Sequence, residues 1–467
     1  MILMKRKCMA FFMTAILLIG LVGCGQSDSS NDSDSAEQNT VASTDDADAD
    51  AAVKTTQSAS EKKLSFDTTI EKTTLFDEQG IKIIANELKF EYNTPKLILT
   101  IKNDTDKKLS FISGSIGYSC NAVNHYMISS GYINEDVAPG KTVKTTATIS
   151  ADELQMLGIT EIANIEIGLR VTDDDYNEYL TTGPLTIETS AADSYDSSAD
   201  TYRDSIQNQW PDDVASLDYY SEELLFEESG ISITSEALAT NKEGKKAVFI
   251  EMENSNSDLV YASVSDISVN GIVIQSPTWT GETINPDCRC VMNLTIDDML
   301  NSSSLEELGI DDIATVEFSM KAEDSNHNVL ANAEEVTIKV KDGGSADNGG
   351  KEIYNENGIR ISSKQITKDE FDNMHILLIV ENNYTEKLDV DVAYDSLSIN
   401  DIMIDFLTYG ADVAVGKSAV VDVEITESTL EENDIADITD VSAAEMTLEI
   451  RDDHYNDIAK PSVVISY

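Results

Sequence analysis

The sequence is poor in positive charge. Lysine and arginine supply 32 of its 467 residues, aspartate and glutamate supply 86, and the formal net charge at pH 7 is −54. Nucleic-acid binding requires basic patches that neutralise phosphates, and electrostatic docking on anionic lipids requires clusters of lysine and arginine. The charge therefore argues against both kinds of partner.

Residues that commonly carry chemistry are also scarce. The sequence has no Gly-x-Ser-x-Gly, His-Glu-x-x-His or Gly-x-x-x-x-Gly-Lys-[Ser/Thr] motif, so the common hydrolases and nucleoside triphosphatases are not indicated. No two of its four histidines have metal-ligand spacing; they are His125, His327, His375 and His454. We expect a protein that is not an enzyme. An enzyme assembled from dispersed carboxylates is the less favoured alternative.

The sequence lacks a long hydrophobic run, but it begins with a short one. Lys5, Arg6 and Lys7 precede a largely apolar segment at residues 9–22. This segment is shorter than the about 20 residues of a transmembrane helix, and it has the length and basic flank of a signal-peptide core.

The apolar segment ends in Leu21-Val22-Gly23-Cys24, which resembles the lipobox of bacterial lipoproteins. The resemblance implies that residues 1–23 are a signal peptide and that Cys24 becomes the first mature residue, carrying a diacylglyceryl thioether. Two acyl chains anchor a protein stably, whereas one is marginal. An ordinary secretory signal with a chance cysteine is the alternative. The predicted location is the extracytoplasmic face of the cell membrane.

Residues 24–72 are rich in serine, aspartate, alanine and threonine and are nearly free of aromatic residues. Such a segment buries too little apolar surface to fold, so we predict a disordered acidic tether. Beyond Cys24, the mature chain holds Cys120, Cys288 and Cys290. An odd number of cysteines in an exported protein argues against a disulfide framework, and we expect free thiols.

The rest of the chain is a threefold repeat. Each copy opens with a Gly-Ile pair, beginning at Gly80, Gly230 and Gly358, and each then has an apolar-alternating strand that ends in asparagine. These asparagines are Asn103, Asn254 and Asn382. We predict module 1 at residues 73–189, module 2 at 223–341 and module 3 at 352–467. Linkers are predicted at residues 190–222 and 342–351.

Apolar residues alternate with polar ones in a block that aligns without gaps between residues 159–177, 310–328 and 438–456. A period of two with one apolar face is typical of a half-buried antiparallel strand. About seven short strands per copy predict an all-β chain of three immunoglobulin-like sandwiches, although a barrel is also compatible with the strand count. Ser150 and Glu153 have capping-box spacing, which predicts one short helical turn in each module, with the Leu305/Leu308 and Leu430 segments as its counterparts.

The lipobox, the acidic tether and the repeated blocks together resemble uncharacterised multi-module surface lipoproteins of anaerobic Gram-positive bacteria. The resemblance covers the whole chain but is architectural. It implies a surface location and no catalytic residues.

One acidic turn recurs in all three copies and is the best candidate for a metal site. Its oxygen-rich side chains suit Ca²⁺, which takes 6–8 oxygen ligands. The alternative is a hairpin loop in which aspartate and asparagine cap the backbone. No other cofactor is indicated. The candidate residues are Asp173, Asp174, Asp175 and Asn177 in module 1, Asp324 and Asn328 in module 2, and Asp452, Asp453 and Asn456 in module 3.

Aromatic residues lie beside a shared glycine between the middle strands of each copy. Tyr132, Trp279 and Tyr409 are the candidate contacts for a partner, because aromatic side chains dominate interface hot spots. The alternative is that these rings close the end of each sandwich. The sequence favours a non-catalytic binding or adhesion protein whose partner is a protein or glycan at the cell surface. A structural spacer, or an accessory subunit of an exported complex, is the alternative.

The lipid anchor leads to a direct test. Because the thioether needs a sulfur nucleophile, Cys24→Ser should leave a soluble or uncleaved protein, whereas the wild-type protein should enter the detergent phase on partitioning. Equal membrane association of the two proteins would contradict the prediction.

Overall fold

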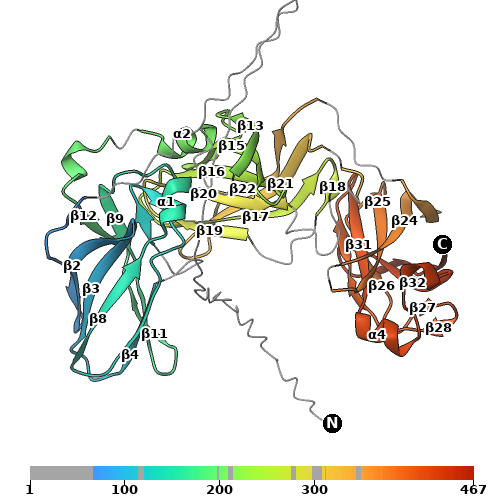
Figure 1. The fold of residues 1–467 in the computed structure, drawn as a ribbon, viewed down its shortest axis with the longest axis horizontal. Coiled ribbons are helices and arrows are strands. Elements are labelled where there is room, and N and C mark those ends of the chain that lie inside the picture. Colours follow the sequence, from blue (N-terminus) through green and yellow to red (C-terminus); the bar gives the residue numbers. More distant parts are fainter. Residues whose placement is uncertain are drawn as a thin grey trace, which may run out of the picture. The chain divides into compact units, whose positions relative to one another are not determined.

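The structure is a computed structural model. It describes residues 67–467 except 114–119, 197–198, 209–213, 275–279, 297–304, 306–307, 311, 343–348 and 370, and the side chain of residue 365 is also not described. These residues belong to one compact unit, Ser58–Tyr467 (Figure 1).

Each module contains a first sheet that holds the strand ending in the repeated asparagine. Strands that follow one another in the sequence pair in antiparallel fashion. The strand ending in asparagine also pairs with one strand from later in the sequence of the module. In module 1 the strands of this sheet are β1 (Thr73–Glu78), β2 (Ile81–Glu91), β3 (Thr94–Asn103) and β8 (Lys141–Thr148). In module 2 they are β13 (Val214–Ser221), β14 (Phe226–Glu228), β15 (Ile231–Asn241), β16 (Lys246–Asn254) and β20 (Cys288–Thr295). In module 3 they are β23 (Lys351–Glu356), β24 (Ile359–Lys368), β25 (Met374–Asn382), β29 (Leu407–Tyr409) and β31 (Ser418–Ile425). The strand from later in the module is β8, β20 or β31, respectively.

The second layer of each module is built around the strands of the gapless repeated block. In module 1 it comprises β4 (Leu109–Ser113), β5 (Ala122–Val123), β6 (Tyr126–Met127), β7 (Ile133–Val137), β9 (Asn164–Ile167), β10 (Arg170–Asp173), β11 (Glu178–Thr181) and β12 (Leu185–Glu188). In module 2 it comprises β17 (Val260–Val269), β18 (Ile272–Val273), β19 (Thr280–Ile284), β21 (Thr315–Asp324) and β22 (Val329–Lys339). In module 3 it comprises β26 (Leu388–Val392), β27 (Ser398–Ile399), β28 (Ile402–Met403), β30 (Ala411–Val413), β32 (Ala443–Asp452), β33 (Asp457–Ala459) and β34 (Ser462–Ser466).

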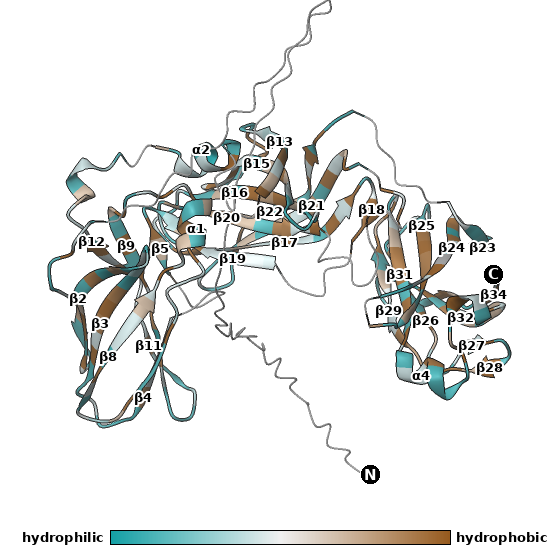
Figure 2. Cartoon of the chain, viewed as in Figure 1, coloured by the Kyte–Doolittle hydropathy of each residue, from teal (hydrophilic) through white to brown (hydrophobic). Residues whose placement is uncertain are grey.

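The apolar faces of the two layers pack together in each module. β3 alternates buried and half-buried positions along its whole length, as its alternating sequence predicts, and Figure 2 shows hydrophobic residues concentrated on the strands. Three apolar clusters result, one centred on each module. The predicted all-β fold of tandem sandwiches is confirmed.

The repeated asparagine joins the two layers. Asn103 is fully buried, and its Nδ2 donates to the carbonyl oxygens of Lys107 and Val137, both at 2.8 Å. Asn254 and Asn382 make the equivalent pairs of bonds in their own modules. A buried amide that satisfies carbonyls of the opposite layer explains why each strand ends in this residue.

Consecutive modules share sheets. β6 of module 1 pairs in parallel with β20 of module 2, and β18 of module 2 pairs in parallel with β31 of module 3. The second layer of one module thereby continues into the first sheet of the next, which produces sheets of nine and ten strands.

The prediction of a linker at residues 190–222 is corrected by the structure, because the described part of this segment is folded and packed against both modules. This segment forms the 3-10 turn η1 (Ala192–Ser194), helix α2 (Thr201–Gln207) and β13, which pairs with β15. Tyr202 and Ile206 are fully buried in the core of module 1. The sequence gives little sign of this, because the neighbouring residues in the segment are polar. Gly158 permits the packing, since a Cβ there would lie 2.0 Å from the carbonyl oxygen of Thr201. The tether also ends earlier than residue 72, because Thr68 is already buried.

Short helical turns occur at the predicted places in modules 1 and 3, although the carboxylate of Glu153 accepts from Ser129 and Ser130 and not from the backbone N–H of Ser150. Ser150 caps α1 (Ala151–Met156), and Thr426 caps α4 (Glu427–Glu432), each through its side-chain oxygen. A 3-10 turn, η2 (Ile438–Asp440), follows in module 3. In module 2 most of the predicted turn lies outside the described residues, although Leu305 and Leu308 are buried. Among the described residues, no helix has both the length and the apolar character needed to cross a membrane.

The packing of α2 generates a prediction. Tyr202→Ala should lower the free energy of unfolding by about 3–5 kcal/mol, because it empties a buried aromatic position. Tyr176→Ala, at a side chain that is 85% exposed, should change the free energy of unfolding by less than about 0.5 kcal/mol. Denaturant unfolding of both variants provides the measurement, and equal small effects would show that residues 190–222 act as a linker.

Candidate functional site

The predicted acidic turns are tight hairpins at β10–β11, β21–β22 and β32–β33. In each, one carboxylate oxygen of the first aspartate accepts two backbone N–H bonds from the residues two and four positions later. Asp173 accepts from Asp175 and Asn177 at 3.1 Å, Asp324 from Asn326 and Asn328 at 2.8 and 2.9 Å, and Asp452 from His454 and Asn456 at 2.9 and 2.8 Å. The first aspartate of each turn therefore caps the loop.

Hydrogen bonds within the turns also lower the pKa values of Asp452 and Asp324. The side-chain amide and backbone N–H of Asn456 hold the pKa of Asp452 below its usual range, and Asn328 does the same for Asp324. Asp452, Asp453 and His454 offer three ligand atoms within 4.8 Å of one another. A Ca²⁺ site at these turns stays a prediction, and an ion would compete with the bonds that close the loop.

Each acidic hairpin also presents one exposed ring that the sequence interpretation missed. Tyr176, His327 and Tyr455 occupy equivalent positions with φ of 61°, 61° and 62°. Tyr176 is 85% exposed, Tyr455 is 73% exposed, and the His327 side chain is 90% exposed. Bulky residues rarely adopt this left-handed conformation, which costs on the order of 1–3 kcal/mol. The gapless alignment of the three blocks was the available signal.

The predicted partner-binding aromatics are dispersed, one in each module. Tyr132 is 56% exposed, and Tyr409 is 36% exposed with its hydroxyl donating to Glu424 Oε2 at 3.1 Å. Neither ring belongs to the apolar core cluster of its module. Trp279 lies outside the described residues, as does Cys24.

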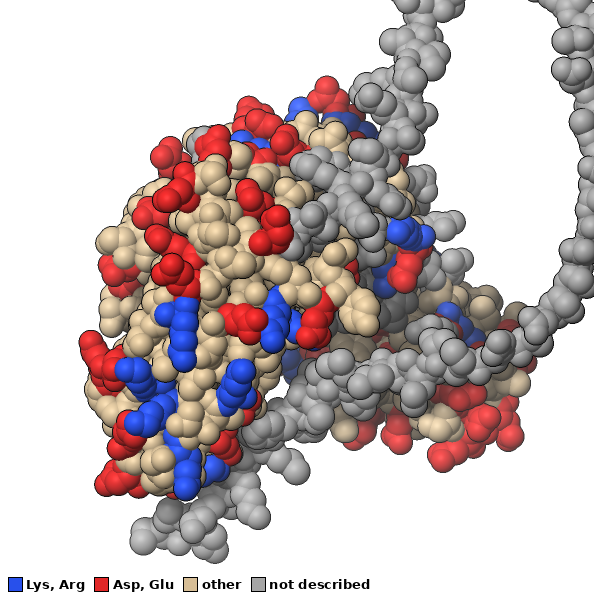
Figure 3. All heavy atoms as spheres, turned by 60° about the vertical axis from the view of Figure 1, so that its left-hand side comes forward, with Lys and Arg blue, Asp and Glu red and all other residues tan. Residues whose placement is uncertain are grey.

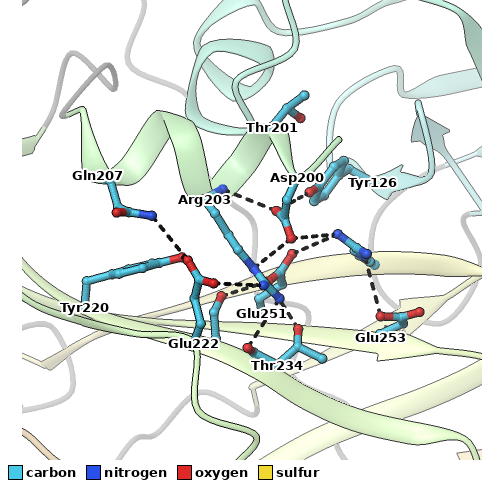
Figure 4. A network of polar contacts seen from close by, with 12 residues as sticks. Tyr126, Asp200, Thr201, Arg203, Gln207, Tyr220, Glu222, Thr234, Glu251 and Glu253 are labelled. Carbon is cyan, nitrogen blue, oxygen red and sulfur yellow. Dashed lines mark hydrogen bonds and ion pairs between the residues drawn. The ribbon is translucent and has the colours of Figure 1, made fainter. Parts of the chain in front are cut away.

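A network of charges lies where modules 1 and 2 meet (Figure 4). Glu251 on β16 is fully buried, and its Oε2 accepts from Arg203 Nε at 2.9 Å and from Ser235 Oγ at 2.7 Å. Arg289 on β20 contacts Asp200 at 2.9 Å, and the same carboxylate accepts the hydroxyl proton of Tyr126 at 3.0 Å. Module 1, α2 and module 2 thus meet in one set of paired charges.

The electrostatics of this network indicate a structural role. Burial opposes the charge of Arg289, but its interactions with Tyr126, Glu251 and Asp200 outweigh burial and raise the pKa above its usual range. Burial, aided by the negative charge of Glu251, raises the pKa of Tyr126. The arginines stay charged and the tyrosine stays neutral at physiological pH, so the network joins the modules through paired charges.

A cleft of about 690 Å³ lies beside this network, between α1 and the β16–β20 face. Met127, Met156, Phe249 and Met292 contribute apolar lining, and Glu153 and Glu282 contribute carboxylates. Burial first, and then the negative charge of Glu153, raise the pKa of Glu282 to about 7. The cleft can accept a small ligand with an apolar body and a hydrogen-bonding or cationic group.

Cys120, Cys288 and Cys290 are free, as expected from their odd number, and all three are buried. Burial raises the pKa of the Cys120 thiol to about 11, and burial also raises that of Cys288. His125, Glu166 and Cys288 place ligand atoms within 4.8 Å of one another. However, Glu166 Oε2 already accepts from Asn285 Nδ2 at 2.7 Å, so a metal ion would have to displace a buried bond.

Comparisons with known proteins identify no family. No protein-family model and no curated protein sequence matches the chain. Solved structures that match the chain include one described in a study of the host cell surface retention of a 1.5-MDa bacterial ice-binding adhesin, at 12% identity and a TM-score of 0.15, covering 80% of this chain and 90% of that chain. Another is the exo-chitosanase CsxA of Amycolatopsis orientalis, at 9% identity and a TM-score of 0.17, covering 48% and 25%. A protein of unknown function from Porphyromonas gingivalis W83 matches at 9% identity and a TM-score of 0.16, covering 48% and 92%. Similarity this low carries no argument about function.

The pKa of Glu282 leads to a pH-dependent prediction. The folded state binds the Glu282 proton more tightly than the unfolded state, so this residue reduces the free energy of unfolding as pH rises from about 4.5 to about 7. Glu282→Gln should therefore be more stable than wild type at pH 8, by on the order of 2 kcal/mol, and nearly equal to it at pH 4.

Urea unfolding at the two pH values measures the effect. Glu227→Gln, at an exposed position of β14, is the matched control and should show no such pH-dependent difference. A Glu282→Gln variant that is no more stable than wild type at pH 8 would contradict the assignment.

Proposed function

We propose that the chain is a membrane-anchored extracellular lipoprotein whose three modules form a non-catalytic binding or adhesion array. Cys24 would carry the lipid, and the acidic segment after it would hold the modules away from the membrane. The partner is a protein or glycan at the cell surface.

The repeated exposed ring of the acidic hairpins is the observation that carries this proposal. Tyr176, His327 and Tyr455 each occupy a left-handed backbone position that glycine would occupy at lower cost. A ring that is costly to the fold and exposed to solvent gains nothing for stability, so its retention in three modules is best explained by contact with a partner. Exposed rings flanked by carboxylates suit stacking on sugar rings and hydrogen bonding to hydroxyl groups.

The junctions between modules support the spacer alternative. Continuous sheets and paired charges couple each module to the next, as an extended presenting arm would require. This role predicts no ligand for the hairpins, so a single set of variants separates the two functions.

The test uses the folded unit, residues 58–467, and a triple variant in which Tyr176, His327 and Tyr455 are each replaced by glycine. Binding is measured to intact bacterial cells and to a panel of purified cell-wall polysaccharides. A binding array predicts at least a tenfold loss for the triple variant. The free energy of unfolding should change by less than about 1 kcal/mol per site, because relief of the left-handed strain opposes the greater unfolded-state freedom of glycine.

Tyr92→Gly is the matched control. Tyr92 also has a positive φ and is fully exposed, but it lies in the β2–β3 turn outside the acidic hairpins. If the triple variant binds as tightly as the wild-type protein, the proposed role of the hairpins is rejected.

A further inference from the structure

The second layer of every module contains the same short hairpin. Its strands are β5–β6 in module 1, the end of β17 with β18 in module 2, and β27–β28 in module 3. The first turn residue is an asparagine with φ near 50° in each case, namely Asn124, Asn270 and Asn400. Its side chain bonds three backbone groups of the neighbouring segment in the same pattern each time. We call this element the docking hairpin.

The docking hairpins of modules 1 and 2 bind the next module in the same way. The carbonyl oxygen of the second turn residue accepts a backbone N–H from the edge strand of the following first sheet: His125 from Arg289 at 2.7 Å, and Gly271 from Ser418 at 3.0 Å. The following residue, Tyr126 or Ile272, lies opposite that donor in a parallel pair. Arg289 and Ser418 are equivalent, because each pairs with the residue before the repeated asparagine.

Docking buries the outer strand of the hairpin. Tyr126 is 3% exposed and Ile272 is 0% exposed, and Val273 belongs to the apolar core of module 3. In module 3 the equivalent residues, Ile402 and Met403, are 45% and 60% exposed. Strand β28 ends its sheet in the described part of the chain.

The opposite end of the array has the complementary unpaired edge. β8 of module 1 is equivalent to β20 and β31, and it forms the last strand of its sheet among the described residues. Thr142, which pairs with the residue before Asn103, is the counterpart of Arg289 and Ser418 and is exposed. Within the part of the chain that the structure describes, the array therefore has one docking hairpin and one acceptor edge without a partner strand.

A glutamate occupies the same aligned position at both junctions and lies near the residue that precedes the backbone donor. Glu317 of module 2 forms an ion pair with Lys417, the residue before Ser418, and Glu166 of module 1 approaches Cys288, the residue before Arg289. The gapless alignment makes Glu445 the module 3 equivalent of these glutamates, and Lys141 precedes Thr142 on β8. Both Glu445 and Lys141 are exposed. Docking of β28 on β8 would bring them together as Glu317 and Lys417 are brought together.

The wider charge distribution fits this pairing. In a chain of net charge −54, β8 carries Lys141 and Lys144; Figure 3 shows lysine and arginine side chains gathered on one side of the molecule, with carboxylates among them. The module 3 hairpin carries Asp401 in its turn and Asp405 after β28. Opposite charges on the two free edges favour their encounter.

We propose that copies of this chain associate head to tail, with the β27–β28 hairpin of one copy docked in parallel on β8 of the next. The backbone carbonyl oxygen of Asp401 would accept the backbone N–H of Thr142, as His125 and Gly271 do at the two existing junctions. Ile402 would lie opposite Thr142, and Glu445 would pair with Lys141. The contact uses different surfaces on the two copies, so it is heterologous and propagates into chains unless a ring closes. It adds the same kind of joint that the molecule already contains twice.

Crosslinking tests the register. Residues 58–467 carrying Ile402→Cys are mixed with the same unit carrying Thr142→Cys under mild oxidation. Directly paired strand residues lie within disulfide reach, so the mixture should yield a disulfide-linked heterodimer. Val464→Cys, at a 53%-exposed position on β34, replaces Ile402→Cys in the matched control and should give at least tenfold less heterodimer.

Charge reversal tests the side-chain contact without added cysteines. Sedimentation velocity over a concentration series should show association that weakens at least tenfold in Glu445→Lys and in Lys141→Glu, and that recovers when both changes are present. Glu356→Lys, which makes the same charge change on exposed β23, should associate as wild type does. A chain that stays monomeric up to about 1 mM, or a heterodimer yield no higher than that of the Val464→Cys control, would overturn the proposal.

Discussion

The parallel pairing between a two-residue strand and the edge of the next sheet is the contact on which the array depends. A short docking hairpin has no core of its own, and it is held in shape by an asparagine side chain that bonds three backbone groups beside it. Once docked, its outer residues complete the apolar core of the following module, as Val273 does for module 3. Removing a hairpin would therefore expose the edge of one module and the core of another, so the modules are coupled rather than strung on flexible linkers.

This coupling must overcome the repulsion expected in so acidic a chain. Three cations lie where modules meet: Arg203 and Arg289 at the first junction and Lys417 at the second. Glu251 shows why this matters, because a fully buried carboxylate without a cationic partner would cost several kcal/mol. The cations thus permit close packing of acidic modules, while the outward-facing hairpins keep their negative charge.

In the acidic hairpins, unlike at the junctions, a side chain is exposed to solvent at a cost to stability. Their backbone hydrogen bonds would close the loop with almost any residue at the fourth position, yet module 1 places Tyr176 there and module 3 places Tyr455, both in a left-handed conformation. The protein tolerates that strain at its surface while it packs its interior conventionally. Function is accordingly best sought at these rings and at the cleft beside Glu282, rather than in the sandwich cores.

The sequence by itself determined the local structure: alternating residues specify strands, Ser150 and Thr426 specify helix starts, and the repeated asparagine marks the end of the same strand in each module. It favoured free cysteines only through their odd number, and the structure has Cys120, Cys288 and Cys290 free and buried. Only the tertiary structure decided that residues 190–222 fold, that Arg203 meets Glu251 across 48 positions of the chain, and that Glu282 shares a cleft with Glu153. Periodicity reports which face of a segment is buried, because that depends on residues two positions apart. It does not identify the distant segment that packs on that face. The docking of modules, the placement of cations and the raised pKa of Glu282 all depend on such contacts between distant segments.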